Sequence, residues 1–338
     1  MKLAKKEAMS NGLFMKDKAR SNGLVMKDKG FVPKVPKSLK ETGINDVLLE
    51  DLIFKLLLNQ GTLSGRQVAH KLCLPFKILE KTLQGLKTRM LVGHRSTTGV
   101  SDFTFVLTGE GRKKAIAARD DSAYIGPAPV PFDQYLISVG EQSIIKESPQ
   151  NKDLMRAFSD LVLEPYILET LGPAINSGRG VFLYGDPGNG KTSIAKRIYK
   201  CFREEIFIPK TLLIEGQIVK LFDPQCHERS DRPEERPATY DQRWVHIKRP
   251  AVIVGGEMDL SSVEINYNPA TKLCEAPMQL KANCGIFVVD DFGRQRMKPE
   301  ELLNRWILPL EKRIDFLTLP NGIKVQVPFD ELVIFCTN

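Results

Sequence analysis

The 338-residue sequence has no long apolar run. No stretch approaches the ~20 apolar residues that a membrane-spanning helix needs. The Lys-rich N-terminus is followed by no apolar stretch that could serve as a signal peptide. These absences disfavour membrane and secreted proteins, and we expect a cytoplasmic protein without membrane association. With 42% hydrophobic and 27% charged residues, the chain has the composition of a globular protein that buries a proper core.

Closely spaced cysteines are also absent. The six cysteines include no C-x-x-C pair, and a chain of this size does not need disulfides, so we expect reduced thiols. Cys226 and His227 form the only adjacent Cys/His pair in the sequence. Because no second cluster lies at ligand spacing, an ordinary loop is a better interpretation of this pair than a zinc site.

The excess of positive charge is confined to the N-terminus. The chain carries +8; its first 40 residues hold eleven Lys and Arg against three acidic residues, and the rest holds 38 of each sign. Residues 10–20 and 21–31 are near-duplicates, SNGLFMKDKAR and SNGLVMKDKGF, without an apolar face. We therefore predict a disordered basic tail over residues 1–40. A solvated leader or a spurious extension of the reading frame is favoured over an arm that touches nucleic acid or an acidic partner.

Residues 41–122 show the pattern of a small α+β domain. Apolar periodicity predicts helices at residues 45–58, 64–72 and 76–90, strands at 91–94 and 103–107 around a polar turn, and a last helix to residue 119. This order of elements resembles the winged-helix family, which docks either DNA or proteins. Lys77 and Lys81 on the third helix would meet DNA phosphates. Because residues 41–121 carry only twelve basic against nine acidic side chains, a protein partner is slightly favoured.

A connecting segment is predicted over residues 123–152. A Pro-rich stretch at 124–131 and a polar stretch at 147–152 delimit it. Residues 153–176 have the pattern of one helical run, which opens the second domain, residues 153–338.

The second domain contains a complete phosphate-binding loop between a strand and a helix. Residues 181–184 predict the strand, and Ile194 and Ile198, one turn apart, predict the inward face of the helix. The glycines of the loop let backbone N–H groups crowd round phosphate oxygens, and the helix N-terminus adds positive potential. We expect Lys191 on the β- and γ-phosphates of ATP and Thr192 on Mg²⁺. The expected nucleotide contacts are Gly185, Asp186, Pro187, Gly188, Asn189, Gly190, Lys191, Thr192 and Ser193.

A second buried strand, residues 285–289, ends in two carboxylates about a hundred residues after the loop. Asp290 is predicted to help hold Mg²⁺, as the acidic residue at the end of this strand does in P-loop ATPases. Asp291 stands where the base that polarises the attacking water is expected. An Asp-Asp pair alone would be better interpreted as a helix cap, but its pairing with the loop favours the catalytic interpretation.

Three segments together resemble the AAA+ ATPase superfamily, and among its members the MoxR-like proteins with a pre-sensor-1 hairpin. They are the loop, the passage LKANCGIFVVDD at residues 280–291, and the hairpin at 316–328 followed by Thr337 and Asn338. The resemblance covers about residues 158–338. It implies an α/β P-loop sandwich with a mainly parallel sheet, ATP and Mg²⁺ as ligands, and a homo-oligomer in the form of a hexameric ring. It also implies catalytic roles for Lys191, Asp291 and Asn338, the last as sensor 1.

The chain departs from this family in two places. AAA+ proteins mostly carry Glu where this chain has Asp291, which is one methylene shorter and reaches less far towards the water. The arginine finger, the last core strand and the C-terminal lid of the family would follow Asn338, so the chain looks truncated. Arg305 and Arg313 precede sensor 1, and we interpret them as surface salt-bridge partners.

Three functions stay open on the sequence. The favoured one is Mg²⁺-dependent ATP hydrolysis that drives the chaperone-like remodelling of a protein partner held by the winged-helix domain. The first alternative is a DNA-binding regulator that uses nucleotide as a switch. The second is a nucleotide-binding scaffold with little hydrolysis.

Overall fold

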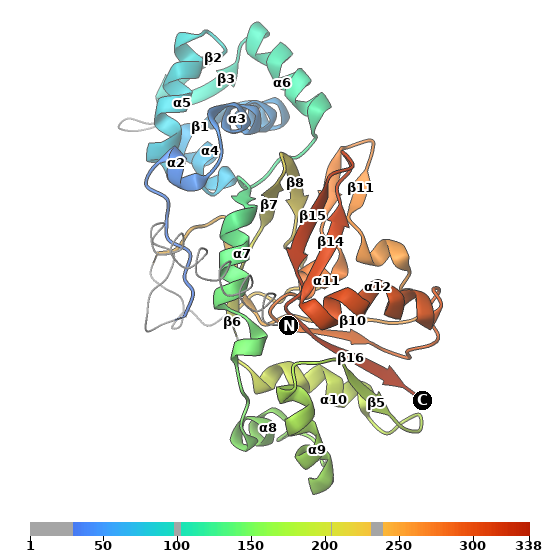
Figure 1. Ribbon diagram of the computed structural model, residues 1–338. Coiled ribbons are helices and arrows are strands. Elements are labelled where there is room, and N and C mark those ends of the chain that lie inside the picture. The colour runs from blue at the N-terminus through green and yellow to red at the C-terminus, as the bar shows by residue number, and fades with distance from the viewer. Residues whose placement is uncertain (1–29, 98–102, 204, 231–238) are drawn as a thin grey trace, which may run out of the picture.

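The computed structural model describes residues 30–97, 103–203, 205–230 and 239–338. Figure 1 shows an N-terminal module above a larger body. The described residues of that body form a four-stranded sheet, a five-stranded sheet and two two-stranded sheets. The duplicated segment lies almost wholly outside the described ranges. Within those ranges, every helix is too short or too polar to span a bilayer.

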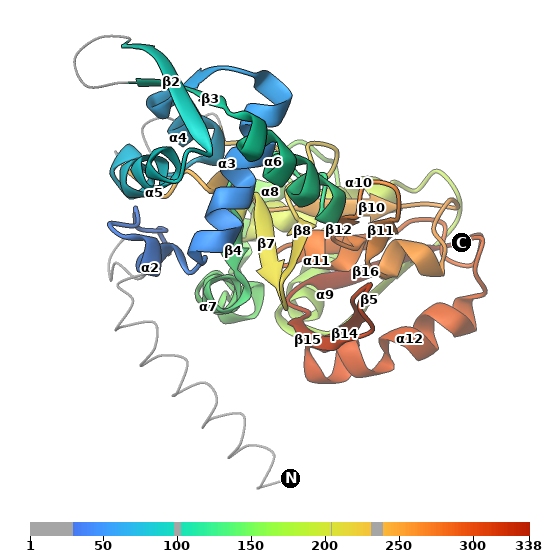
Figure 2. The same ribbon diagram turned by 90° about the horizontal axis from the view of Figure 1, so that it is seen from above.

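The N-terminal module packs helices against a small antiparallel sheet. Its helices are α2 (Leu39–Thr42), α3 (Asp46–Gln60), α4 (Gly65–Leu72), α5 (Phe76–Thr88) and α6 (Gly109–Asp121). The strands β1 (Leu63–Ser64), β2 (Val92–Thr97) and β3 (Phe103–Leu107) lie in the order β1-β3-β2. Asn45 caps α3, and a capping box of Ser64 and Gln67 starts α4. Figure 2 shows α6 beside α3. The helices and the hairpin predicted from periodicity are confirmed, and β1 was not foreseen.

The prediction of disorder up to residue 40 is wrong for residues 31–40. Phe31 and Val32 are buried, and the Phe31 ring lies 5.4 Å from that of Trp244. The backbone N–H of Asp241 donates to the carbonyl oxygen of Pro33 at 3.0 Å. Two apolar side chains thus anchor a segment whose composition is otherwise that of a linker.

The connecting segment predicted at residues 123–152 is largely regular structure. It holds β4 (Val130–Pro131), α7 (Phe132–Glu141) and the 3₁₀ helix η1 (Ile144–Lys146). Tyr135 and Val139 on α7 are buried among apolar side chains of the second body. Pro and Gly near residue 127 mark the end of one module, but the apolar face of α7 makes residues 132–141 part of the next.

The upper sheet of the second body, which we call the junction sheet, has the order β11-β12-β8-β7-β4. Its strands besides β4 are β7 (Thr211–Ile214), β8 (Gln217–Lys220), β11 (Asn266–Asn268) and β12 (Leu273–Glu275). β7 and β8 form a hairpin that turns at Glu215 and Gly216, whose φ angles are 45° and 78°. Next to this sheet, β6 (Glu205–Pro209) pairs antiparallel with β9 (Trp244–Lys248). The pairing of β6 with β9 was not foreseen.

The lower sheet is wholly parallel, in agreement with the predicted parallel sheet, and its strand order is β10-β13-β16-β5. Its strands are β5 (Val181–Tyr184), β10 (Ala251–Val254), β13 (Ile286–Val289) and β16 (Leu332–Thr337). On one face Ile286, Val288 and Ile334 pack under α10 (Lys191–Ile198), together with α8 (Asn151–Ala157) and α9 (Pro165–Asn176). On the other face Phe287 and Phe335 pack against Trp306 of α12 (Pro299–Lys312). Helices therefore cover both faces of this sheet.

Three further features complete this body. The helical run predicted at residues 153–176 is two helices, α8 and α9, because Pro165 starts a new helix after an irregular stretch. The short helix α11 (Met278–Ala282) precedes β13. The predicted hairpin before the last strand is confirmed as β14 (Ile314–Thr318) and β15 (Lys324–Pro328).

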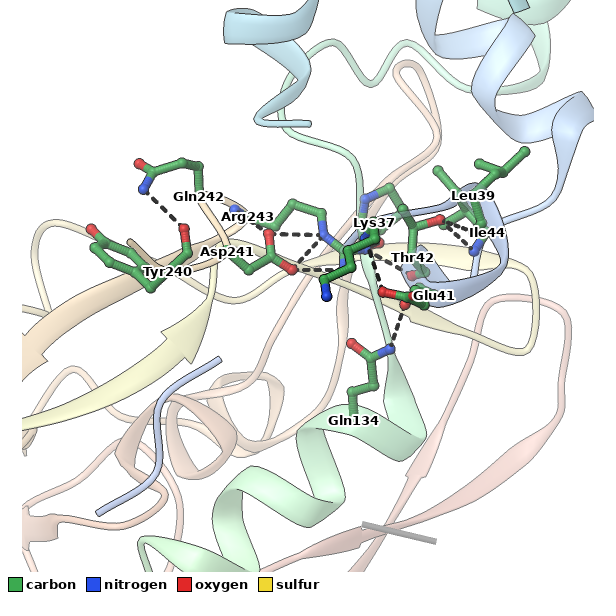
Figure 3. Close-up of polar contacts among 11 residues, drawn as sticks. Lys37, Leu39, Glu41, Thr42, Ile44, Gln134, Tyr240, Asp241, Gln242 and Arg243 are labelled. Atoms are coloured by element: carbon green, nitrogen blue, oxygen red, sulfur yellow. Dashed lines mark hydrogen bonds and ion pairs between the residues drawn. The ribbon is translucent and has the colours of Figure 1, made fainter. Parts of the chain in front are cut away.

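A buried ion pair joins the two parts of the molecule (Figure 3). The side chains of Arg243 and Asp241 are 1% and 3% exposed, and their Nη2 and Oδ2 atoms lie 2.7 Å apart. Arg243 Nη1 also donates to the carbonyl oxygen of Thr42, at the end of α2, at 2.8 Å and to that of Pro129 at 3.3 Å. One guanidinium thus holds the N-terminal module, the segment before β4 and the start of β9. We call these four residues the junction.

Candidate functional site

The candidate site lies at the carboxyl edge of the parallel sheet. Because β5, β13 and β16 run in the same direction, the residues that follow them meet at one edge, where α/β proteins bind ligands. The glycine-rich loop follows β5, Asp290 and Asp291 follow β13, and Asn338 follows β16. The sheet order thus gathers residues that are up to 153 positions apart in the sequence.

The loop has the backbone that a phosphate cradle needs. Gly188 and Gly190 have φ angles of 88° and 72°, which L side chains rarely adopt, and no atom lies within 4 Å of where a Cβ would stand at either. Gly190 is the N-cap of α10, so the first backbone N–H groups of that helix face the loop. Asp186, Pro187 and Asn189 are exposed on the same loop. An anion can therefore approach the main chain closely at this place.

Lys191 spans the loop and the last strand. Its Nζ donates to the carbonyl oxygens of Gly185 at 2.6 Å and Asp186 at 3.0 Å, and to Asn338 Oδ1 at 2.6 Å. These three acceptors satisfy the three donors of the ammonium group. A triphosphate that engages Lys191 must replace them, and phosphate oxygens are stronger acceptors because they are charged.

Thr192 and Asp290 form the oxygen cluster of the site. Thr192 Oγ1 donates to both carboxylate oxygens of Asp290, at 2.9 and 3.0 Å. Hydroxyl and carboxylate oxygens suit Mg²⁺, which keeps several waters and takes few protein ligands. The donor set and its position beside the loop therefore fit a magnesium ion that also contacts phosphate. The other predicted contact, Ser193, has an exposed side chain.

Asp291 sits in a strained turn that a neighbouring glutamine closes. Its φ angle is 49°, in the left-handed region, and its side chain is exposed at the edge of the site. Gln295 Nε2 donates to the carbonyl oxygens of Asp290 at 2.8 Å and Asp291 at 3.2 Å. Gln295 Oε1 accepts from the backbone N–H of Gly293 at 2.8 Å. No role is predicted for Gln295 from the sequence, in which Gly293, two residues earlier, is the local signal of a tight turn.

The turn is also tied to the strand that carries Asn338. The backbone N–H of Phe292 donates to the carbonyl oxygen of Cys336 at 2.7 Å, and Thr337 Oγ1 donates to that of Phe292 at 3.3 Å. Burial raises the pKa of the Cys336 thiol to about 11, with the Asp290 carboxylate as a smaller cause. The thiol therefore stays protonated next to the oxygen cluster.

The two arginines singled out by the sequence bond to groups outside this cluster. Arg305 binds Asp315 at 2.5 Å and Glu264 at 3.1 Å, and Asp315 is 1% exposed. Arg313 Nη1 donates to the carbonyl oxygen of Glu331, and burial lowers the pKa of Arg313. Arg305 is thus a partly exposed salt-bridge partner, as predicted, whereas Arg313 is half-buried and bonds to a main-chain oxygen, so the prediction is wrong for Arg313. Glu257 is exposed and accepts from the backbone N–H of Gly255 at 3.0 Å.

Comparison with known proteins gives partial likenesses. No family model matches the chain. The vesicular-fusion protein sec18 of Schizosaccharomyces pombe is 37% identical over 89 residues, which cover 24% of this chain and 11% of that protein. The chain thus spans about a tenth of the length of this relative.

Solved structures give weaker likenesses. The complex of magnesium chelatase subunits BchI and BchD has a TM-score of 0.32 at 17% identity, over 58% of this chain and 54% of that chain. NtrX from Brucella abortus has a TM-score of 0.30 at 17% identity, over 68% of this chain and 42% of that chain. Both are proteins of the AAA+/P-loop type. Both TM-scores are below 0.5, and the sheet order and packing of this chain define its fold without them.

Proposed function

We propose that the chain binds ATP with Mg²⁺ at the glycine-rich loop and hydrolyses it as an ATPase of the AAA+ type. The observation that carries this proposal is the meeting of Lys191, Thr192, Asp290 and Asn338 at one sheet edge, through contacts of 2.6 to 3.0 Å. A phosphate cradle, a cation for the phosphates and a magnesium ligand set at that edge are what phosphoryl transfer requires.

Each residue has a separate task in this proposal. Lys191 and the loop hold the β- and γ-phosphates, and Thr192 with Asp290 holds Mg²⁺, which neutralises charge on the phosphates. Asp291 takes the proton of the water whose oxygen attacks the γ-phosphorus, and Asn338 helps to hold that water. The bond from the γ-phosphorus to the bridging oxygen breaks, and ADP and phosphate leave.

The proposal is tested by nucleotide binding and phosphate release on the full chain. Lys191→Ala and Asp290→Asn should weaken the binding of a fluorescent ATP analogue in the presence of Mg²⁺, and Asp291→Asn should bind it but release little phosphate. Lys196→Ala, on the exposed face of the same helix, is the matched control. Equal binding and equal phosphate release in all variants would exclude the loop as the site.

The use of this activity is also a proposal. The N-terminal module, a winged-helix domain in this proposal, holds a protein partner that a ring of such chains remodels with energy from ATP. One observation favours DNA as the alternative ligand, since Lys77, Lys81 and Lys87 are exposed on one helix, α5, with only Glu80 among them as an exposed acid. Retention of the full chain on duplex DNA that falls steeply with salt would support DNA; no retention at low salt would exclude it.

A third function, nucleotide binding with weak hydrolysis, is favoured by the backbone conformation of Asp291. Asp291 is both shorter than Glu and held in a left-handed backbone, so its carboxylate has a restricted position. A chain that binds ATP tightly but releases phosphate no faster than Asp291→Asn would be a nucleotide-binding scaffold.

A further inference from the structure

The turn after β13 is stabilised by one side chain whose polar atoms all serve the main chain of the turn. Gln295 uses its Nε2 group on the carbonyl oxygens of Asp290 and Asp291 and its Oε1 on the N–H of Gly293. The side chain is half-buried, so water competes with these bonds only partly. No other side-chain amide in the described ranges closes a turn at the candidate site.

These hydrogen bonds matter because the backbone conformation of Asp291 is unfavourable without contacts that stabilise it. A left-handed conformation costs a residue other than glycine roughly 1–2 kcal/mol, and it persists only where surrounding contacts fix it. Here those contacts are the two bonds from Gln295, the bond from Arg294 N–H to the Asp291 carbonyl oxygen at 3.0 Å, and the tie from Phe292 to Cys336. Two other side chains also bond to the turn: Asp290 Oδ1 accepts from the N–H of Asp291 at 3.2 Å, and Thr337 Oγ1 donates to the carbonyl oxygen of Phe292 at 3.3 Å. Gln295 is the side chain that bonds to the main chain of the turn three times.

We propose that Gln295 is a positioning residue, which holds Asp291 in the left-handed turn that directs its carboxylate towards the γ-phosphate side of the site. The inference rests on the proposed ATPase function. Within the described ranges, the hydrogen bonds of Gln295 go to Asp290, Asp291 and Gly293, and none goes to the loop, Lys191 or Thr192. Its removal should therefore leave nucleotide binding intact. Its removal should slow the chemical step alone, because a small displacement of the catalytic base lowers turnover without changing the affinity for nucleotide.

The test compares Gln295→Met and Gln295→Glu with the wild-type chain. Met keeps the length and removes the polar atoms; Glu keeps the shape but presents acceptors to two carbonyl oxygens. We expect turnover to fall roughly ten- to a hundredfold, with KM and the affinity for a fluorescent ATP analogue unchanged, and the larger loss in Gln295→Glu. Hydrogen–deuterium exchange over residues 290–296 should accelerate in both variants. Gln84→Met, an exposed glutamine of α5, is the matched control and should change neither quantity.

The possible outcomes separate the two proposals. Wild-type turnover and exchange in Gln295→Met would overturn the positioning role while leaving the ATPase intact. A loss of affinity equal to the loss of turnover would also overturn it, because the variant would then have damaged the whole site. A wild-type chain that binds nucleotide but shows no turnover above Asp291→Asn would overturn both proposals.

Discussion

Replacement of Arg243 by Met should destabilise the chain strongly, although the residue lies far from the candidate site. The guanidinium is 1% exposed and satisfies Asp241, which is 3% exposed, and two main-chain carbonyl oxygens. Removal of one partner of a buried ion pair leaves the other charge uncompensated, which costs about 3–5 kcal/mol. This is a large part of the 5–15 kcal/mol by which proteins are typically stable.

A second substitution should restore part of this stability. In the double variant Asp241→Asn with Arg243→Met no unpaired charge is left, so the remaining cost is that of the bonds to Thr42 and Pro129, about 1 kcal/mol each. The double variant should therefore be more stable than Arg243→Met alone. Arg119→Met, which removes an arginine from an exposed pair with Asp120, is the matched control and should have little effect.

The assay is urea unfolding followed by tryptophan fluorescence. The chain has two tryptophans; Trp244 adjoins the junction and Trp306 lies under the parallel sheet. In a Trp306→Phe background the signal reports the surroundings of the junction. If the two substitutions simply add, so that the double variant is the least stable of the series, the buried charge is not the source of the loss and the reasoning fails.

Three further predictions concern other parts of the chain. Glu331 is fully buried, its carboxylate oxygens have no hydrogen-bond partner among the described residues, and burial raises its pKa well above the ordinary value. The wild-type chain is fully stable only below the pKa that Glu331 has in the unfolded state, and it loses stability as the pH rises above that value. Glu331→Gln should therefore have the same free energy of unfolding as wild type near pH 4.5, and relative to wild type it should gain up to about 1.4 kcal/mol for each pH unit above it. A gain in the urea midpoint that does not change with pH would contradict this. Burial raises the pKa of Cys201 to about 12 and that of Cys336 to about 11. At pH 8 about one in a thousand Cys336 groups is a thiolate, so alkylation of both cysteines, followed by mass spectrometry, should be far slower than alkylation of a model thiol. Alkylation rates like those of the model thiol would show that these cysteines are not buried. Gly43→Ala should cost about 1–3 kcal/mol more than Gly61→Ala, because both glycines have positive φ but only at Gly43 would the Cβ collide with the Pro131 ring; equal melting temperatures would show that the ring yields.

The candidate site could be predicted from the sequence because its parts are local. The loop, the helix after it and the carboxylates after β13 are each specified by a few consecutive residues, and the parallel order of the strands brings their ends together. The resemblance to the AAA+ superfamily implied a mainly parallel sheet, whereas the order of its strands is known only from the structure. The roles of these residues stay predictions, whereas their meeting at one edge is a property of the structure.

The parts that were missed depend on contacts between distant residues. Phe31 and Val32 form too short a pattern to indicate an element, and they are buried because they join an apolar cluster with Val130, Ile137, Phe207 and Trp244. β6 and β9 pair across 34 intervening residues, and neither strand alone indicates the partner. Gln295 was missed for the opposite reason, since its bonds are local but a polar residue after a turn has many possible roles. Short apolar segments and single amides therefore need the tertiary structure before they can be interpreted.

The junction has a consequence for how the two parts of the chain can evolve. Arg243 contacts the N-terminal module and the following segment through main-chain oxygens of Thr42 and Pro129, and every residue type presents such an oxygen. The side chains at these two positions can therefore change without loss of the bonds, while Arg243 and Asp241 cannot change independently of each other. In a family of such chains, Arg243 and Asp241 would change together. The residues at the positions of Thr42 and Pro129, on the other side of the boundary, would show no correlated changes with them.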